Sequence, residues 1–146
     1  MFTQRHYFLV ADQMAGVSYY QFEEDKNGNL MSLHPDHQSH PFIEELRDVD
    51  IIVNGMLQDT DHPLMLVTED QNDQLKPGCL IVDISCDEGM GFSFAKPTTF
   101  EAPIFTAGKA FYYAVDHSPS YLWDAATWEI SISLVPSLPV ILEGPV

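Results

Sequence analysis

Short runs of apolar residues, many of them β-branched, recur along the chain and are separated by turn signals. Three runs, near residues 50–54, 79–85 and 111–116, are nearly continuous rather than alternating with polar residues. Continuous runs of this length are typical of strands covered on both faces, as in a parallel α/β sheet. We therefore predict that the three segments form a mostly parallel sheet with helices packed on its faces.

Helix signals lie between and after these strands. Pro41, followed by two glutamates, suits the first turn of a short helix. Thr68 with Gln71 three residues later is a capping-box pattern, which predicts a second brief helix before the central strand. Ser118-Pro119 predicts the start of a longer helix, which Pro136 ends. This alternation of strands and helices favours the α/β class.

The N-terminal stretch has a different pattern. Apolar runs at residues 7–10 and 17–22 are followed by the turn signal Asn27-Gly28-Asn29 and by a third run at residues 30–33. Apolar runs joined by a turn of this composition indicate a β-hairpin. We expect the hairpin to lie at an edge of the sheet or to form a small appendage.

Acids and glycines follow the central strand. The run at residues 79–85 continues into Asp87, Glu88, Gly89 and Gly91. In open α/β sheets, ligands bind just beyond the carboxyl ends of the strands. A carboxylate followed by glycines at that edge is therefore a candidate site. The alternative is an ordinary polar junction between a strand and a loop.

The net charge limits the classes of partner that the protein can bind, and the cysteines indicate the cell compartment. The formal net charge is −16, from 22 acids against six lysines and arginines, which argues against nucleic acid and anionic membrane surfaces as partners. Apolar runs stay well short of the roughly 20 residues of a membrane span. Cys79 and Cys86 flank one predicted strand, too far apart along it to bridge. They indicate reduced thiols in a cytoplasmic protein.

Three histidines, His34, His37 and His40, recur at intervals of three residues and could chelate a metal. Pro35 and Pro41 disrupt any helix that would align the three rings. We therefore favour a polar loop that happens to contain histidines, and we predict no metal site.

Four blocks of sequence occur in a fixed order along the chain: DVDIIVNGMLQDT, KPGCLIVDISCDEG, KPTTFEAPIF and FYYAVDHSPSYLWDAATWEIS. They resemble the C-terminal half of the alanine dehydrogenase and saccharopine dehydrogenase superfamily. Its opine-forming branch, that of N5-(carboxyethyl)ornithine synthase, is the most similar. The resemblance implies that residues 41–117 are the C-terminal half of a Rossmann-like dinucleotide-binding domain. It also implies that residues 118–146 form a helix returning toward a catalytic domain. Residues 1–40 remain an N-terminal β segment of unplaced origin.

The resemblance also implies site residues. In the alanine dehydrogenase branch, an aspartate in the loop after the central strand serves the active site beside the nicotinamide, and its match here is Asp87. A cap or a solvated loop acid is the alternative for Asp87, and a core or cap histidine is the alternative for His117. Asp83, within the strand, is predicted to be a structural hydrogen-bonding residue, and the two tryptophans to be packing residues. The implied cofactor-binding positions are Gly55, Met56, Leu57, Ser85, Cys86, Val115, Asp116, His117 and Ser118.

The reaction that the resemblance implies is NADP- or NAD-dependent oxidoreduction at a C–N bond. A 2-oxo acid such as pyruvate would condense reductively with an amino acid such as ornithine, or the chemistry would be that of alanine dehydrogenase. The pattern G-x-G-x-x-G does not occur in this sequence, and the family's first domain, with its catalytic histidine, has no match. The alternative is thus a truncated, non-catalytic Rossmann remnant, acting as an interaction module or a partner-dependent subunit. A homo-oligomer or a missing N-terminal subunit would then complete it.

Overall fold

The computed structural model describes residues 6–12, 16–36, 38–56 and 58–143. The chain divides into two compact units, Met1–Val115 and Asp116–Val146. Each unit is described by itself.

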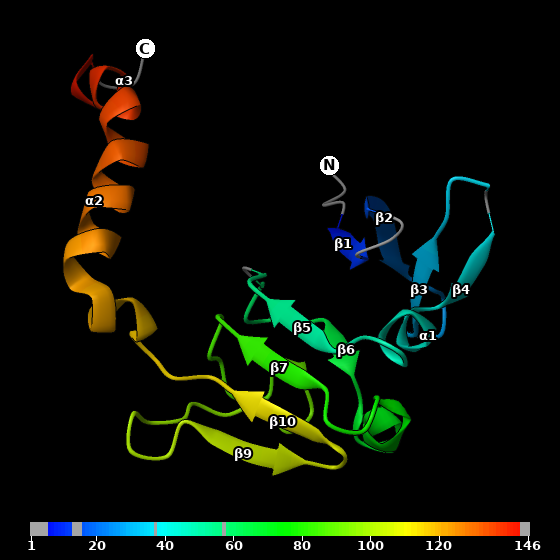
Figure 1. Cartoon of the computed structure of the whole chain (residues 1–146). Coiled ribbons are helices and arrows are strands. Elements are labelled where there is room, and N and C mark those ends of the chain that lie inside the picture. Colours follow the sequence, from blue (N-terminus) through cyan, green and yellow to red (C-terminus); the bar gives the residue numbers. More distant parts are fainter. Residues whose placement is uncertain (1–5, 13–15, 37, 57, 144–146) are drawn as a thin grey trace. The chain divides into compact units, whose positions relative to one another are not determined.

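The first unit begins with an antiparallel sheet. Its strands are β1 (His6–Asp12), β2 (Gly16–Glu24), β3 (Leu30–Leu33) and β4 (Ser39–Pro41), in that order across the sheet (Figure 1). Strand β2 pairs with β3 across the Asn27-Gly28-Asn29 turn, so the predicted N-terminal hairpin is confirmed. The hairpin is extended by a further antiparallel strand on each side.

The turn between β2 and β3 is organised by the Asp25 carboxylate. Its Oδ1 accepts the backbone N–H groups of Asn27 and Asn29, each at 2.8 Å. The backbone hydrogen bond from Asn29 is the main cause that holds the pKa of Asp25 below its ordinary value near 3.8. A carboxyl group whose folded-state pKa is lowered adds stability above its unfolded-state pKa, and this stability is lost as the pH falls through the folded-state value.

We expect Asp25→Ala to lower the melting temperature at neutral pH, by a margin that shrinks as the pH falls below about 4. The variant Asp25→Asn is the matched control, because it keeps an accepting oxygen but has no titrating group. Thermal unfolding of the three proteins between acid and neutral pH measures the effect. A margin between wild type and Asp25→Ala that does not change with pH would contradict this role.

The main sheet has the order β5 (Ile51–Asn54), β7 (Leu80–Asp83), β10 (Ala110–Tyr113) and β9 (Ile104–Ala107). The pairs β5–β7 and β7–β10 are parallel, and β10–β9 is antiparallel. The three predicted strands therefore form the mostly parallel sheet expected of a Rossmann-like α/β fold (Figure 1). The antiparallel edge strand β9 comes from the segment that contains Pro97 and Pro103.

The core of the unit lies on one face of this sheet. Ile81 and Tyr112, both fully buried, point into it from the central strands. Three phenylalanine rings surround the Tyr112 ring at centroid distances of 5.0–6.0 Å. They are Phe92, Phe94 and Phe105. The two-stranded parallel sheet of β6 (Met65–Val67) and β8 (Gly91–Phe92) supplies one of these rings.

Among the described residues of the first unit, nothing covers the opposite face of the main sheet, which differs from the prediction that the central strands are buried on both faces. Side chains alternate between the two faces along each strand, and the register aligns one apolar set on the uncovered side. The pattern of the runs was continuous because both faces carry apolar residues, although one face has no cover in this unit. We call the apolar residues on this side the open face: Ile51, Val53, Leu80, Val82, Ile84, Ile104 and Phe111. Thr106 and Tyr113 lie on the same side.

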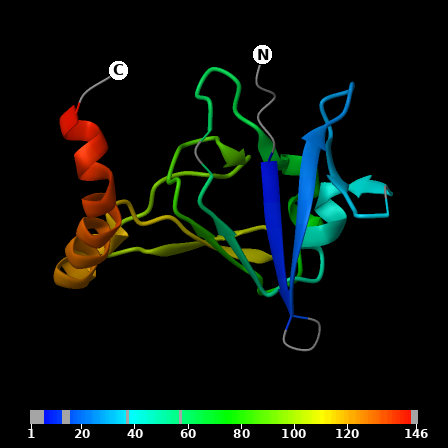
Figure 2. The ribbon, with the colours of Figure 1, turned by 90° about the horizontal axis from the view of Figure 1, so that it is seen from above.

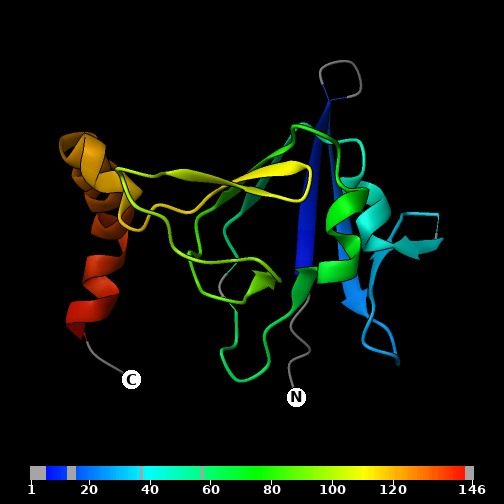
Figure 3. The same ribbon diagram turned by 90° about the horizontal axis from the view of Figure 1, so that it is seen from below.

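The two short helices of the unit form where the capping signals predict them. Helix α1 (Phe42–Leu46) follows Pro41 and buries its three apolar residues. The 3-10 helix η1 (Glu69–Gln74) follows Thr68, whose backbone N–H donates to Oε1 of Gln71 at 3.2 Å, as a capping box requires. Figure 3 shows η1 beside α1, and the Arg47 guanidinium just after α1 donates to Oε1 of Gln74 at 2.8 Å.

The second unit is helical. The 3-10 helix η2 (Ser118–Leu122) leads into α2 (Trp123–Leu134), and the turn η3 (Val135–Ser137) leads into α3 (Leu138–Glu143) (Figure 2). The predicted helix start at Ser118-Pro119 and its end before Pro136 are confirmed. Trp123 and Trp128 are each 66% exposed, so within the described residues of this unit they do not pack as predicted. None of the helices in the described part of the chain is both long and apolar enough to cross a membrane.

Candidate functional site

The carboxyl ends of β5 and β7 meet at one edge of the main sheet, because the two strands are parallel and in register. The Ser85 hydroxyl, beyond β7, donates to the backbone carbonyl of Met56, beyond β5, at 3.0 Å. The Asn54 amide donates to the same hydroxyl at 3.3 Å, and its own oxygen accepts the N–H of Met56 at 3.3 Å. The predicted cofactor residues Met56 and Ser85 are thus brought into contact. Gly55 lies between Asn54 and Met56 and is exposed, whereas Leu57 lies outside the described residues.

A buried carboxylate lies beneath this contact. Asp83, which is 1% exposed, accepts the Asn54 amide at 3.0 Å and the Ser85 N–H at 3.1 Å on Oδ1. Its Oδ2 accepts the Tyr112 hydroxyl at 2.6 Å. Burial first, and then this hydrogen bond, raise the pKa of Tyr112 far above its ordinary value of 10. The predicted structural role of Asp83 is therefore confirmed, and the residue joins the ends of three strands.

The backbone bends sharply just after this network. Cys86 has a positive φ of 57°, and its thiol donates to the backbone carbonyl of Asp83 at 3.2 Å. A left-handed conformation in a residue other than glycine is uncommon and marks a position where the surrounding structure imposes it. The bend leads directly into Asp87, which is exposed and whose carbonyl accepts the N–H of Met90 at 3.3 Å.

The loop that follows Asp87 comes close to the buried hydrogen-bond network of Asn54 and Asp83 at Gly91. This glycine has a φ of +76°, and a β-carbon at its position would lie 3.1 Å from the amide nitrogen of Asn54. A side chain here would therefore press on the group that connects β5 to β7. Gly89, two residues earlier, also has a positive φ but has open space around it.

The remaining predicted cofactor residues lie after β10. Val115 is buried at the end of the first unit and bridges to Thr98. Asp116, His117 and Ser118 begin the second unit. His117 has a φ of 60°, and its ring lies 3.4 Å from the exposed carboxylate of Asp116. Cys86 and His117 are the two residues other than glycine that have a positive φ within the described ranges.

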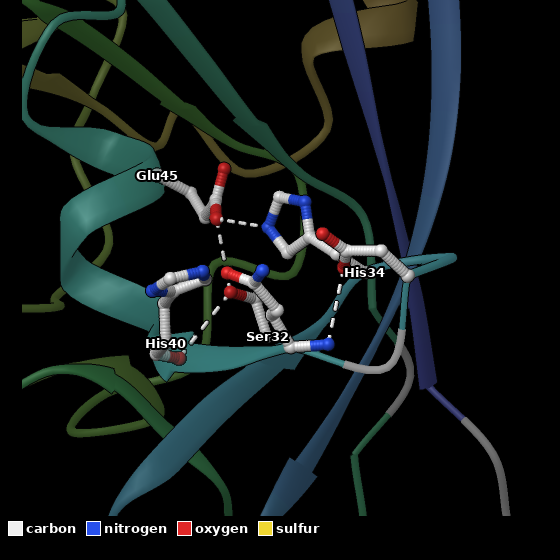
Figure 4. A network of polar contacts seen from close by, with 6 residues as sticks. Ser32, His34, His40 and Glu45 are labelled. Atoms are coloured by element: carbon white, nitrogen blue, oxygen red, sulfur yellow. Dashed lines mark hydrogen bonds and ion pairs between the residues drawn. The ribbon is translucent and has the colours of Figure 1, made fainter.

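The histidines of the N-terminal sheet form a different cluster (Figure 4). Nε2 of His34 lies 2.7 Å from Oε1 of Glu45, and the fully buried Ser32 hydroxyl lies 2.9 Å from the same oxygen. These contacts attach α1 to β3. Across the described residues, no group of three or more histidines, cysteines or acids is placed to hold a metal ion. His37, the middle member of the histidine series, lies outside those residues.

Two members of the buried network were not identified from the sequence. Asn54 is a single polar residue at the end of an apolar run, and Tyr112 lies inside another run. The polar last position of the β5 run was a usable signal, because a buried amide at a strand end must find a partner. Tyr112 gave no such signal, since tyrosine is common in strands.

Comparisons with known proteins agree with this fold. The family model described as alanine dehydrogenase/PNT, C-terminal domain, matches residues 13–143, which include most of the N-terminal β segment. A solved structure of an L-alanine dehydrogenase superposes with a TM-score of 0.55 at 20% identity, over 70% of this chain and 28% of that one. At that level of identity the likeness concerns the fold.

Two curated relatives illustrate the range of similarity. An N(5)-(carboxyethyl)ornithine synthase of Clostridium botulinum is 38% identical over 88 residues, which are 60% of this chain and 27% of that protein. An alanine dehydrogenase of Halomonas elongata is 28% identical over 93 residues, which are 64% of this chain and 25% of that protein. This chain therefore spans about a quarter of the length of these relatives. Because the family model covers most of the sequence, the chain belongs to the alanine dehydrogenase/PNT C-terminal domain family.

Proposed function

We propose that this chain carries the nicotinamide-side part of a site for an NADP- or NAD-dependent oxidoreductase that acts on a C–N bond. The observation that carries the proposal is the contact between the loops after β5 and β7 at the carboxyl edge of the sheet. In open α/β sheets this edge is where ligands bind. The positive φ of Cys86, directly before Asp87, supports it, because imposed backbone conformations are concentrated at functional sites.

Asp87 is proposed as the catalytic residue. Its carboxylate is exposed beyond the bend at Cys86 and is free to orient an amine or to exchange protons with it. Gly55, Met56 and Ser85 would line the nicotinamide, which supplies the hydride when bound. Val115, at the end of the first unit, and Asp116, His117 and Ser118, at the start of the second, each stay predicted cofactor-binding positions.

The reaction proposed is reductive condensation of a 2-oxo acid such as pyruvate with an amino acid such as ornithine. Alanine dehydrogenase chemistry is the close alternative. The similarity to both kinds of relative supports this reaction class. We also propose that the protein is cytoplasmic, since both cysteines are free thiols.

A second candidate is a partner-dependent subunit that has no turnover of its own. The specific observation in its favour is the open face, since sheets with parallel strands are ordinarily covered on both sides. A homo-oligomer or a separate N-terminal subunit would supply the cover. The sequence offers no glycine-rich turn for the pyrophosphate, which fits a chain that contributes one part of a larger site.

We expect the chain alone to bind dinucleotide weakly and to show no turnover. Losing two charge-assisted hydrogen bonds to the pyrophosphate, at about 1.5–3 kcal/mol each, weakens affinity by about 10²- to 10⁴-fold. The net charge of −16 also repels an anionic cofactor. Fluorescence titration with NADH and NADPH, and saturation-transfer NMR at high ligand concentration, measure this. The NMR signal is expected on the nicotinamide protons and not on the adenine protons.

The matched pair Asp87→Ala and Glu88→Ala tests the site, because the two neighbouring residues are both exposed acids. The nicotinamide signal is expected to fall in Asp87→Ala and to persist in Glu88→Ala. Equal signals from adenine and nicotinamide, or a loss in both variants, would contradict the assignment of Asp87. Micromolar affinity for either dinucleotide would show that this chain holds a complete cofactor site.

A further inference from the structure

The last residues of β5 and β7 each turn the chain with their own side chain. Oδ1 of Asn54, at the end of β5, accepts the backbone N–H of Met56 at 3.3 Å. Oδ1 of Asp83, at the end of β7, accepts the backbone N–H of Ser85 at 3.1 Å. A side-chain oxygen bound to the N–H two residues on forms an Asx turn, which mimics a backbone turn. Because Asn54 and Asp83 are paired in the parallel register, two matched Asx turns end neighbouring strands at one edge of the sheet.

The two turns are joined by a hydrogen bond that needs one amide and one carboxylate. The Asn54 amide donates to Oδ1 of Asp83 at 3.0 Å, and the two residues are only 4% and 1% exposed. An ionised carboxylate can only accept hydrogen bonds, whereas a carboxamide both donates and accepts them. Asn54 is therefore the member of the pair that can hold its own turn and bind the neighbouring turn at the same time.

The backbone of Met56 is held at both of its polar groups. Its N–H donates to Asn54, and its carbonyl accepts the Ser85 hydroxyl at 3.0 Å. That hydroxyl in turn accepts the Asn54 amide at 3.3 Å, so Asn54 acts on Met56 once directly and once through Ser85. Gly55, inside the turn, is exposed and has no side chain, which allows a ligand to approach the backbone closely.

We propose that Asn54 is a positioning residue of the nicotinamide site, whose carboxamide fixes the turn at Gly55 against which the nicotinamide ring would lie. This inference rests on the proposed function, which assigns the ring to the loops after β5 and β7. Asn54 acts through Gly55 and Met56, because it is buried and its amide and its oxygen both bind protein groups. A turn that is already fixed loses little conformational entropy when a ligand binds to it, so it favours binding.

Asn54→Ala removes the direct contact with Met56 and the donor to Ser85. We expect the affinity for the nicotinamide end of NADH, measured on the full chain by saturation-transfer NMR over a concentration series, to fall about tenfold. Ser32→Ala is the matched control, because Ser32 is also a buried side chain with two hydrogen bonds, but it lies in the N-terminal sheet. We expect this control to keep the affinity of wild type.

The variant Asn54→Asp tests the amide itself. It keeps an oxygen for the N–H of Met56 but places a second carboxyl group at hydrogen-bond distance from Asp83. Two carboxylates so close together repel, so the pair binds a proton more readily than a single carboxylate, and a protonated carboxyl group can donate as the amide does. We expect the affinity of Asn54→Asp to be low at alkaline pH and to recover toward that of wild type as the pH falls, whereas that of Asn54→Ala does not. Wild type at the same pH is the reference, since Tyr112 and Cys86, which also contact Asp83, are common to all three proteins.

Hydrogen exchange of the Met56 backbone amide gives a measurement that needs no ligand. This amide is expected to exchange at least about tenfold faster in Asn54→Ala than in wild type, because its acceptor is gone. Ser32→Ala is expected to leave the exchange rate of this amide unchanged. An unchanged rate in Asn54→Ala would overturn the inference, because the turn would then be fixed without the carboxamide.

The outcomes separate this inference from the function on which it rests. A nicotinamide signal that Asn54→Ala leaves unchanged, or that Ser32→Ala lowers equally, would overturn the role of Asn54 and leave the proposed function standing. The absence of any nicotinamide signal in wild type would overturn both. Urea unfolding shows whether each variant is folded under the conditions of the binding experiment. If Asn54→Ala is not folded, the pH series of Asn54→Asp decides, and an affinity that does not recover at acid pH would overturn the inference.

Discussion

Replacing Asp83 by alanine is expected to lower the free energy of unfolding by about 3–5 kcal/mol. Three donors converge on this carboxylate, from Asn54, Ser85 and Tyr112, at 3.0, 3.1 and 2.6 Å. Asp83 is 1% exposed, so bulk water does not reach the three donors that lose their acceptor in the variant. Each buried donor without an acceptor lowers the free energy of unfolding by about 1–3 kcal/mol. Domains of this size are stable by only about 5–15 kcal/mol, so the loss is large.

Urea unfolding of Asp83→Ala, Asp83→Asn and Asp87→Ala measures this effect. Asparagine keeps one oxygen for the Asn54 and Ser85 donors, and the Tyr112 hydroxyl can rotate to accept from the new amide. We therefore expect Asp83→Asn to cost less than half as much as Asp83→Ala. Asp87→Ala removes an exposed carboxylate from the loop that follows β7 and is expected to change the free energy of unfolding by less than about 0.5 kcal/mol. Similar losses of unfolding free energy in Asp83→Ala and Asp87→Ala would contradict the role of the Asp83 carboxylate as the common acceptor of the buried network.

The second large effect is expected at Gly91, where substitution by alanine should lower the free energy of unfolding by about 2–4 kcal/mol. Two causes add at this position. The φ of +76° is unfavourable for any side chain, and the new β-carbon would lie 3.1 Å from the Asn54 amide nitrogen and 3.4 Å from that of Gln58. The crowding acts on Asn54, so it should also disturb the contact between the loops after β5 and β7.

Gly89→Ala is the matched control for Gly91→Ala. Its φ of +70° imposes a similar backbone cost, of about 1 kcal/mol, but open space surrounds the position. The difference in the free energy of unfolding between the two variants isolates the crowding on Asn54. NMR of the Asn54 side-chain amide should show a shift in Gly91→Ala and none in Gly89→Ala. Equal stability losses would mean that backbone conformation alone accounts for both.

Local features of the fold were predictable because their causes are local. The strand runs, the capping box at Thr68 and the helix start at Ser118-Pro119 each depend on residues that are near one another in sequence. The buried role of Asp83 followed from the same logic, because a single acid inside an apolar run must be hydrogen-bonded. Its partners were not predictable, since strand register brings them from distant segments.

The uncovered face was missed for a different physical reason. An apolar run shows that a strand has two apolar faces, but it does not show which other elements cover them. In β5, Ile51 and Val53 lie at the positions that a doubly covered strand would bury, yet both are exposed. Met56 and Ser85 were both predicted as cofactor-binding positions through the family resemblance, whereas their contact comes from the parallel pairing of β5 with β7.

The antiparallel edge of the main sheet has a consequence for the order in which the fold forms. Strands β9 and β10 are joined by a tight turn at Gly108 and Lys109, so their pairing closes a very short loop. Each parallel pair, in contrast, joins residues roughly 30 positions apart, and its loop-closure entropy must be overcome first. We therefore expect the β9–β10 hairpin to form before β10 pairs with β7. We expect the carboxyl-edge network, which needs three strands, to assemble last in this sheet.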